Sequence, residues 1–178
     1  METNKCKKCG GKGVIEDRFI QFAGGSMGMG LSAGVALAWS KKQRGQEGRV
    51  FVFESDGGMQ VGINYEAMRF AVQHKLDNLV LIVEKNDFQA MGKTEDILSM
   101  ENMRDELKAF GWAVLGVDGH DHNEIEFSLR VSQKEKPFAI IAQTTKGKGI
   151  SYMENNNIFH YRAPSVDEYQ LALKELNG

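Results

Sequence analysis

The sequence predicts an α/β protein built on a parallel sheet with helices on both faces. Four segments are apolar along most of their length, at residues 49–54, 78–83, 112–117 and 138–143. Segments with apolar residues at helical spacing lie between them. Continuously apolar strands that alternate with helices are typical of a parallel sheet buried on both sides.

In the first half of the chain, the spacing of apolar residues and the residues that end helices and strands predict each element. Residues 27–42 are rich in small and apolar side chains, so we expect a well-buried helix with Ser26 as its N-cap. A turn at 44–48 precedes the strand 49–54. A helix over 62–75 then leads to the strand 78–83.

The second half repeats the pattern after a loop at 85–98. Gly111 ends a helix, and a glycine-containing loop follows the last strand. The expected elements are, in chain order, a helix at 101–110, a strand at 112–117, a helix at 123–132, a strand at 138–143 and an amphipathic helix at 167–176.

Composition describes an ordinary globular domain. The 178 residues suffice for one domain with a core, which we place at 24–178 behind a polar lead-in at 1–23. The net charge of −2 gives no electrostatic case for nucleic acid or an anionic membrane. No long apolar run and no signal peptide are apparent, so we expect a cytoplasmic protein with no membrane contact.

The lead-in contains the two cysteines of the chain, Cys6 and Cys9, in a C-x-x-C pair. A structural zinc site normally needs four ligands, and the nearest histidine in sequence is His74. Zinc completed by a distant residue or another chain, and redox use, stay open. Reduced cysteines in a loop are the favoured interpretation.

Polar residues follow two successive strands. Asp56 ends the first and Asn86 the second, and the carboxyl ends of parallel strands are where such sheets bind ligands. Carboxylate and amide oxygens suit Mg²⁺, and Gly57 and Gly58 allow backbone to approach a phosphate. An Asp that caps a helix and an Asn in a turn would give the same pattern.

Longer motifs connect the sequence to a known family. The segment SDGG, with Asn86 thirty residues after its Asp, resembles the thiamine diphosphate motif, and the chain resembles the transketolase family over residues 24–164. The segments that carry the resemblance are GGSMGMGLSAGVALA, HKLDNLVLIVEKNDFQAMGKTEDI, FGWAVLGVDGHD, QTTKGKGISYMENN and FHYRAP.

The resemblance implies a thiamine diphosphate-binding fold, specifically its diphosphate-binding domain, and a set of site residues. Asp56, Asn86 and the carbonyl of Phe88 would hold Mg²⁺. Lys146 and His160 would lie near the diphosphate and the substrate channel, where a lysine supplies positive charge and a histidine can donate a proton. The remaining cofactor contacts would come from Gly25, Ser26, Met27, Gly57 and Gly58.

His120 and His122 invite comparison with a metal site. The family has a similar GHD turn there, and Asp121 or Asn123 can cap the next helix. We therefore interpret the two histidines as part of a turn.

The sequence departs from the family pattern in three places. Ser55 replaces the first glycine of the usual GDG, and Val61 replaces a glutamate that lies where two protomers of the family meet. Only 23 residues precede Gly24, where the family carries about a hundred with cofactor-binding histidines. We expect either a naturally short chain or a second polypeptide that supplies those contacts.

The family's second half, which binds the cofactor's pyrimidine, has no counterpart here. We therefore expect one component of a thiamine diphosphate- and Mg²⁺-dependent enzyme, which pairs with a pyrimidine-binding subunit in a heterodimer or α2β2 assembly. The enzyme would transfer a two-carbon ketol or acetyl unit from a ketose or a 2-oxo acid to an aldehyde or ketone, such as a carbohydrate. The alternative is a non-catalytic regulatory subunit with a degenerate site.

Overall fold

The computed structural model describes residues 20–177 and contains a four-stranded parallel sheet with the strand order β1-β2-β6-β5. The strands are β1 (Val50–Ser55), β2 (Leu79–Lys85), β6 (Phe138–Gln143) and β5 (Ala113–Asp118). The α/β fold with a parallel sheet is therefore confirmed. The cysteine pair and most of the lead-in lie outside the described residues.

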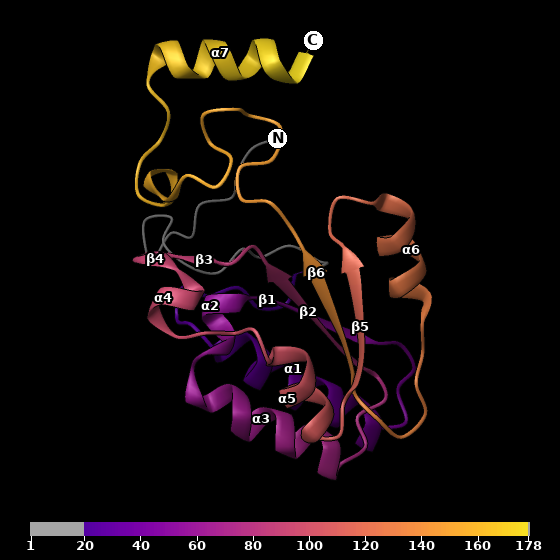
Figure 1. Cartoon of the computed structure of the whole chain (residues 1–178). Helices are drawn as coiled ribbons and strands as arrows, with labels where there is room; N and C mark the ends of the chain where they lie inside the picture. Colours follow the sequence, from indigo (N-terminus) through magenta and orange to yellow (C-terminus); the bar gives the residue numbers. More distant parts are fainter. Residues whose placement is uncertain (1–19, 178) are drawn as a thin grey trace, which may run out of the picture.

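Three helices cover one face of the sheet (Figure 1). They are α1 (Met29–Gln43), α3 (Gly62–Gln73) and α5 (Met103–Ala109). The larger core cluster joins their apolar side chains to alternate residues of the strands, such as Leu79, Leu81 and Ala139. The period of two along each strand sends the intervening residues to the other face.

The other face has lighter cover. Helix α6 (His122–Arg130) packs beside β5, and a smaller cluster forms around Val80, Phe138 and Ile140. This cover does not extend to the edge strand β1, where Phe51 is 47% and Phe53 is 68% exposed.

The glycine-rich helix differs from expectation at its start and in its burial. Helix α1 begins at Met29 and its N-cap is Gly28, which has no side chain to cap it, so the predicted Ser26 cap is wrong. The Glu54 carboxylate instead accepts hydrogen bonds from the first-turn amides of Gly30 and Leu31. Leu37 and Trp39 stay partly exposed, because only one face of the helix meets the sheet.

The predicted loop at 85–98 contains short elements. Strands β3 (Phe88–Gln89) and β4 (Gly92–Lys93) form a small antiparallel hairpin, which leads into the single turn α4 (Thr94–Ile97). Another short helix, α2 (Asp56–Met59), directly follows β1. These short elements lie at the carboxyl end of the sheet, where a ligand site is expected.

The C-terminal part of the chain lies beyond that end of the sheet (Figure 1). It includes the 3₁₀ turn η1 (Asn157–His160) and helix α7 (Val166–Asn177). None of the described helices is both long and apolar enough to span a bilayer.

Candidate cofactor site

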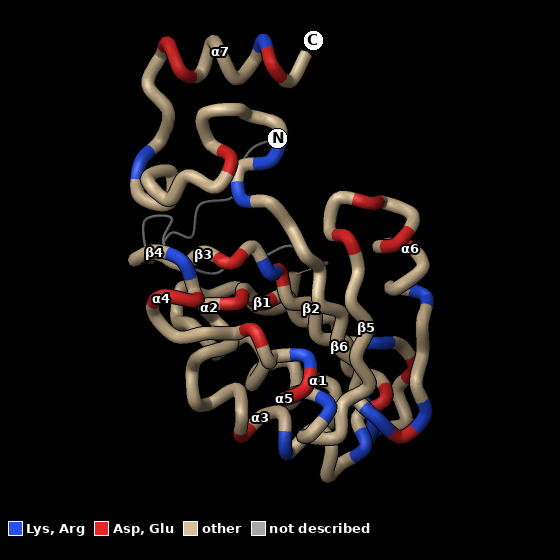
Figure 2. Tube along the Cα trace, viewed as in Figure 1, with Lys and Arg blue, Asp and Glu red and all other residues tan. Residues whose placement is uncertain are grey.

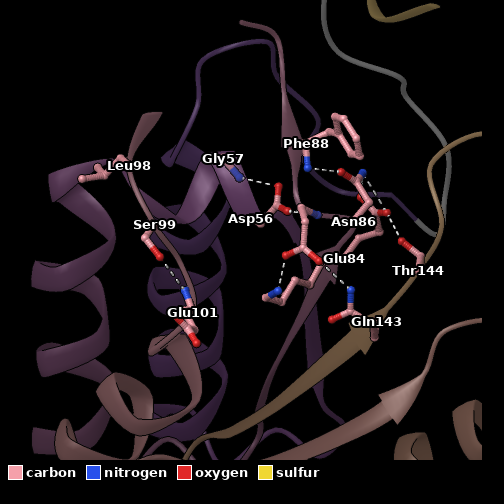
Figure 3. Close-up of polar contacts among 12 residues, drawn as sticks. Asp56, Gly57, Glu84, Asn86, Phe88, Leu98, Ser99, Glu101, Gln143 and Thr144 are labelled. Atoms are coloured by element: carbon pink, nitrogen blue, oxygen red, sulfur yellow. Dashed lines mark hydrogen bonds and ion pairs between the residues drawn. The ribbon is translucent and has the colours of Figure 1, made fainter. Parts of the chain in front are cut away.

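The candidate site lies where β1 and β2 end side by side. Ser55 and Glu84 are register partners in the parallel pair, so Asp56 and Asn86 follow at neighbouring strand ends. Figure 3 shows both side chains at this edge, together with Glu84, Gln143 and Thr144. The structure thus brings together the two side chains that the sequence nominated as metal ligands.

Asp56 is fully buried at the start of α2. One carboxylate oxygen, Oδ1, accepts the Gly57 amide at 2.7 Å, and the other, Oδ2, accepts the Asp87 amide at 2.8 Å. Both oxygens are therefore held in fixed directions by backbone donors.

Ser55 has a defined role in this turn. Its side chain is the N-cap of α2 and accepts the Gly58 amide at 3.0 Å. Serine is among the preferred N-cap residues because its hydroxyl satisfies a free helix amide. The serine that departs from the GDG pattern thus stabilises the turn that presents Asp56.

Asn86 is oriented by a neighbouring carboxylate. Its Nδ2 donates to Glu84 Oε1 at 3.0 Å and to Oε2 at 2.9 Å, while its Oδ1 accepts the Phe88 amide at 2.8 Å. A carboxylate accepts only, so the amide nitrogen of Asn86 faces Glu84 and the oxygen faces away. Glu84 therefore selects the side-chain oxygen for any ligand.

Asp87 joins the two strand ends. Its backbone has φ +63°, a left-handed conformation that is uncommon for residues other than glycine and that aspartate tolerates. The conformation lets its amide reach Asp56 while its Oδ2 accepts Gln143 Nε2 at 2.9 Å. Its Oδ1 pairs with Lys85. Strained backbone of this kind concentrates at functional sites.

Burial raises the pKa of the Asp56 carboxyl above its ordinary value. The Gly57 and Asp87 amides oppose the shift, and the negative charges of Glu84 and Asp87 add to it. A buried carboxylate with acidic neighbours gains stability from a cation placed beside it. The electrostatics around the Asp56 carboxyl therefore favour a nearby cation.

The donor set fits Mg²⁺. Asp56 and Asn86 offer oxygen, the ligand type that Mg²⁺ prefers, and a Mg²⁺ site with few protein ligands leaves room for phosphate oxygens. Phe88, whose carbonyl is the third proposed ligand, is the first residue of β3 and follows Asn86 by two positions. These residues would hold the ion, and the glycine-rich segments beside them would hold the diphosphate.

Two hollows flank the strand ends. One has a volume of about 940 Å³ and is lined by Gly25, Ser26 and Met27 together with Ser55 and Gly58. The methyl of Met27 lies 4.0 Å from where a Cβ on Gly57 would stand. The predicted glycine-rich cofactor contacts are therefore beside α2, as a shared pocket requires.

The other hollow, of about 720 Å³, is lined by Asn86, Phe88, Thr144 and Asn155 among others. Asn155 comes from the C-terminal part of the chain, and Asn157 Nδ2 fixes that part to the hairpin by donating to Ala90 O at 3.0 Å. Lys146 and His160 lie on the same segment without lining either hollow. Their predicted cofactor contacts stay predictions.

The supporting residues were missed from the sequence. Glu84, Asp87, Gln143 and Thr144 are not part of the nominated motif, although each lies within two residues of a strand end. The available signal was Glu84 itself, because a charged residue at the end of an otherwise apolar strand needs a polar partner.

His120 lies in the predicted turn, whereas His122 is the first residue of α6, so the turn interpretation holds for His120 only. Asp121 is the N-cap of α6 and accepts the amides of Asn123 and Glu124. Among the described residues, no three His, Cys, Asp or Glu side chains are grouped so as to hold a metal.

The comparisons with known proteins identify the family and agree with the fold. The family "Transketolase, thiamine diphosphate binding domain" matches residues 4–177, nearly the whole sequence. The chain belongs to this family. The fold described above is therefore that of a thiamine diphosphate-binding domain.

The curated relatives of this family member include separate transketolase subunits. The chain is 38% identical over 169 residues to an apulose-4-phosphate transketolase subunit of Phocaeicola vulgatus, covering 94% of this chain and 60% of the relative. It is 31% identical over 159 residues to "6-deoxy-6-sulfo-D-fructose transketolase subunit SqwG" of Clostridium sp., covering 88% of this chain and 58% of the relative. The chain thus spans about three fifths of these relatives.

Solved structures support the fold. Transketolase from Campylobacter jejuni superposes with a TM-score of 0.80 at 30% identity, covering 87% of this chain and 26% of that one. A transketolase from Pichia stipitis gives 0.78 at 22% identity over 84% of this chain and 24% of the other, which supports the fold alone.

Proposed function

We propose that the chain is the diphosphate-binding subunit of a two-subunit, Mg²⁺-dependent transketolase that transfers a two-carbon ketol unit. The observation that carries the proposal is the fixed pair of oxygens at Asp56 and Asn86, each oriented by its own hydrogen bonds. A site with no ligand to bind has no physical reason to hold two oxygens in fixed directions or to bury the Asp56 carboxyl so that its pKa is raised.

The chain's own residues would bind and orient the cofactor. Asp56, Asn86 and the Phe88 carbonyl would hold Mg²⁺, and the backbone at Gly25, Ser26, Met27, Gly57 and Gly58 would face the diphosphate. Lys146 would add positive charge, and His160 would donate a hydrogen bond or proton to the substrate. Thiamine diphosphate, when bound, supplies the carbanion chemistry.

A second polypeptide would complete the active site. Relatives of similar sequence carry the word "subunit" in their names, which supports a pyrimidine-binding partner in a heterodimer or α2β2 assembly. Those names also favour a ketose as the two-carbon donor over a 2-oxo acid.

The decisive experiment is native mass spectrometry of the full chain co-expressed with its neighbouring reading frames, in thiamine diphosphate and Mg²⁺. We expect a complex that carries cofactor at each interface. A stable complex without cofactor would instead support a regulatory subunit with a degenerate site, which the Val61 departure favours.

A further inference from the structure

We propose that His120 is a positioning residue for the metal-binding side chains, acting through the end of β6. The inference rests on the proposed function and extends it to a residue outside the nominated site. His120 lies in the turn between β5 and α6, at the far edge of the sheet from β1.

The turn holds the end of β6 by its backbone. The Gly119 amide donates to the Gln143 carbonyl at 2.8 Å, and His120 Nε2 accepts the Thr145 amide at 2.8 Å. A Cβ on Gly119 would overlap the Thr144 methyl, so the two segments are packed too closely for a larger residue there. Residues 143–145 are therefore fixed on both sides of Thr144.

Those residues in turn support both candidate metal ligands (Figure 3). The Thr144 hydroxyl donates to Glu84, whose carboxylate orients Asn86. Gln143 Nε2 donates to Asp87, whose amide donates to Asp56. Partners of this kind orient ligands and tune metal affinity even though they do not touch the ion.

The contact requires a neutral acceptor at residue 120. An imidazole nitrogen accepts a hydrogen bond only when it carries no proton, so the proton of His120 must be on Nδ1. The backbone of His120 is itself fixed, because its amide donates to Asp118 Oδ1 at 2.8 Å. The side chain is thus presented to Thr145 by a rigid turn.

Three substitutions test the proposal in the full chain, with its partner where one co-purifies. His120→Ala removes the acceptor, and His120→Gln supplies a neutral acceptor oxygen in its place. His122→Ala is the matched control, because His122 is an exposed histidine two residues further on, at the start of α6. Circular dichroism and thermal melting establish that each variant folds.

Two measurements give the result. Hydrogen exchange of the Thr145 amide, without cofactor, should become about tenfold faster in His120→Ala. Calorimetric titration with Mg²⁺ and thiamine diphosphate should show an affinity about three- to tenfold lower. His120→Gln should restore both quantities to within about twofold of the wild type, and His122→Ala should change neither.

The outcomes separate this inference from the function on which it rests. Faster exchange with unchanged affinity overturns it, because the β6 end would then not support the site. Equal loss in His120→Ala and His120→Gln also overturns it. Absence of cofactor binding by the wild type overturns the proposed function, while the exchange measurement still decides whether the His120 contact exists.

Discussion

The sheet and the C-terminal arm, defined as residues 146–177, are each stabilised by a different kind of contact. The strands of the sheet bury rows of apolar side chains in two core clusters. In the arm, Ala172 is the one buried hydrophobic residue among those described. The arm is held mainly by polar contacts at the surface, including Arg162 with Glu168 and Ser151 with Glu175. Figure 2 shows that residues of both charges occur along this part of the chain.

This difference in stabilisation means that some residues of the candidate site lie on the rigid sheet and others on the more easily opened arm. The oxygens of Asp56 and Asn86 belong to the sheet, whose stability comes from buried area. Lys146 and His160 belong to the arm, whose surface ion pairs contribute little each. Metal binding should therefore depend on the sheet, while the arm can open without unfolding it.

The largest expected effect compares one leucine from each region. Leu81→Ala removes a fully buried side chain of β2 and should lower the free energy of unfolding by about 2–5 kcal/mol. Leu176→Ala alters a side chain that is 60% exposed on α7 and should change it by about 0.5 kcal/mol or less. Urea unfolding of both variants checks the contrast, and similar losses would contradict it.

Loss of Asp56, the proposed metal ligand, should have the next largest effect. Asp56→Ala should weaken Mg²⁺-dependent binding of thiamine diphosphate at least about a hundredfold and leave the fold intact, because the residue offers the one buried carboxylate of the proposed set. Lys146→Ala, in the arm, should weaken it about tenfold, since a point charge on the diphosphate is lost.

Calorimetric titration of these two variants measures the contrast. Asp56→Asn should also weaken binding, because it removes the charge and keeps only one of the two oxygens that accept from Gly57 and Asp87. Full retention of binding by Asp56→Ala would exclude the metal site.

A smaller effect is expected when the orientation of Asn86 is disturbed. Glu84→Gln replaces a carboxylate that accepts two hydrogen bonds from Asn86 by an amide that can accept on one atom only. We expect Mg²⁺ affinity to fall about tenfold. Glu126→Gln, the same change in an exposed pair with Arg130, should leave affinity unaltered. Equal affinities for both variants would remove Glu84 from the site.

Sequence reasoning located the strands well because their signal is local. The strand 138–143 has the predicted bounds, and the other three shift by one or two residues. Apolar runs that end at polar residues mark a buried strand directly. The short elements between 85 and 98 were missed, since two-residue strands and single helical turns form only through tertiary contacts.

The candidate site was predicted in part for a related reason. Asp56 and Asn86 could be paired because parallel strands end at one edge. The supporting contact from Thr144 to Glu84 joins residues sixty positions apart, and nothing in the chain between them indicates it. The Ser26 cap was wrong because Glu54, from the neighbouring strand, takes the helix amides instead.

The smallest expected effect is that of low pH. Acidification should open the arm before it unfolds the sheet. Hydrogen bonds from Arg162 lower the pKa of Glu168 to about 2, so its contribution to the folded arm is complete above its ordinary value of 4.5 and is lost as the pH falls towards 2. The raised pKa of Asp56 acts in the opposite sense, because protonation during acidification relieves a buried charge in the sheet.

Cleavage by pepsin between residues 150 and 165 should therefore accelerate below pH 4.5, while the fluorescence of the buried Trp112 stays native. Glu168→Gln removes the titrating group and should make cleavage faster already at about pH 5, with a flatter dependence on pH. If the Trp112 signal were lost at a higher pH than the onset of cleavage, the arm would not be the weaker region. The division of the site between sheet and arm would then have no basis in stability.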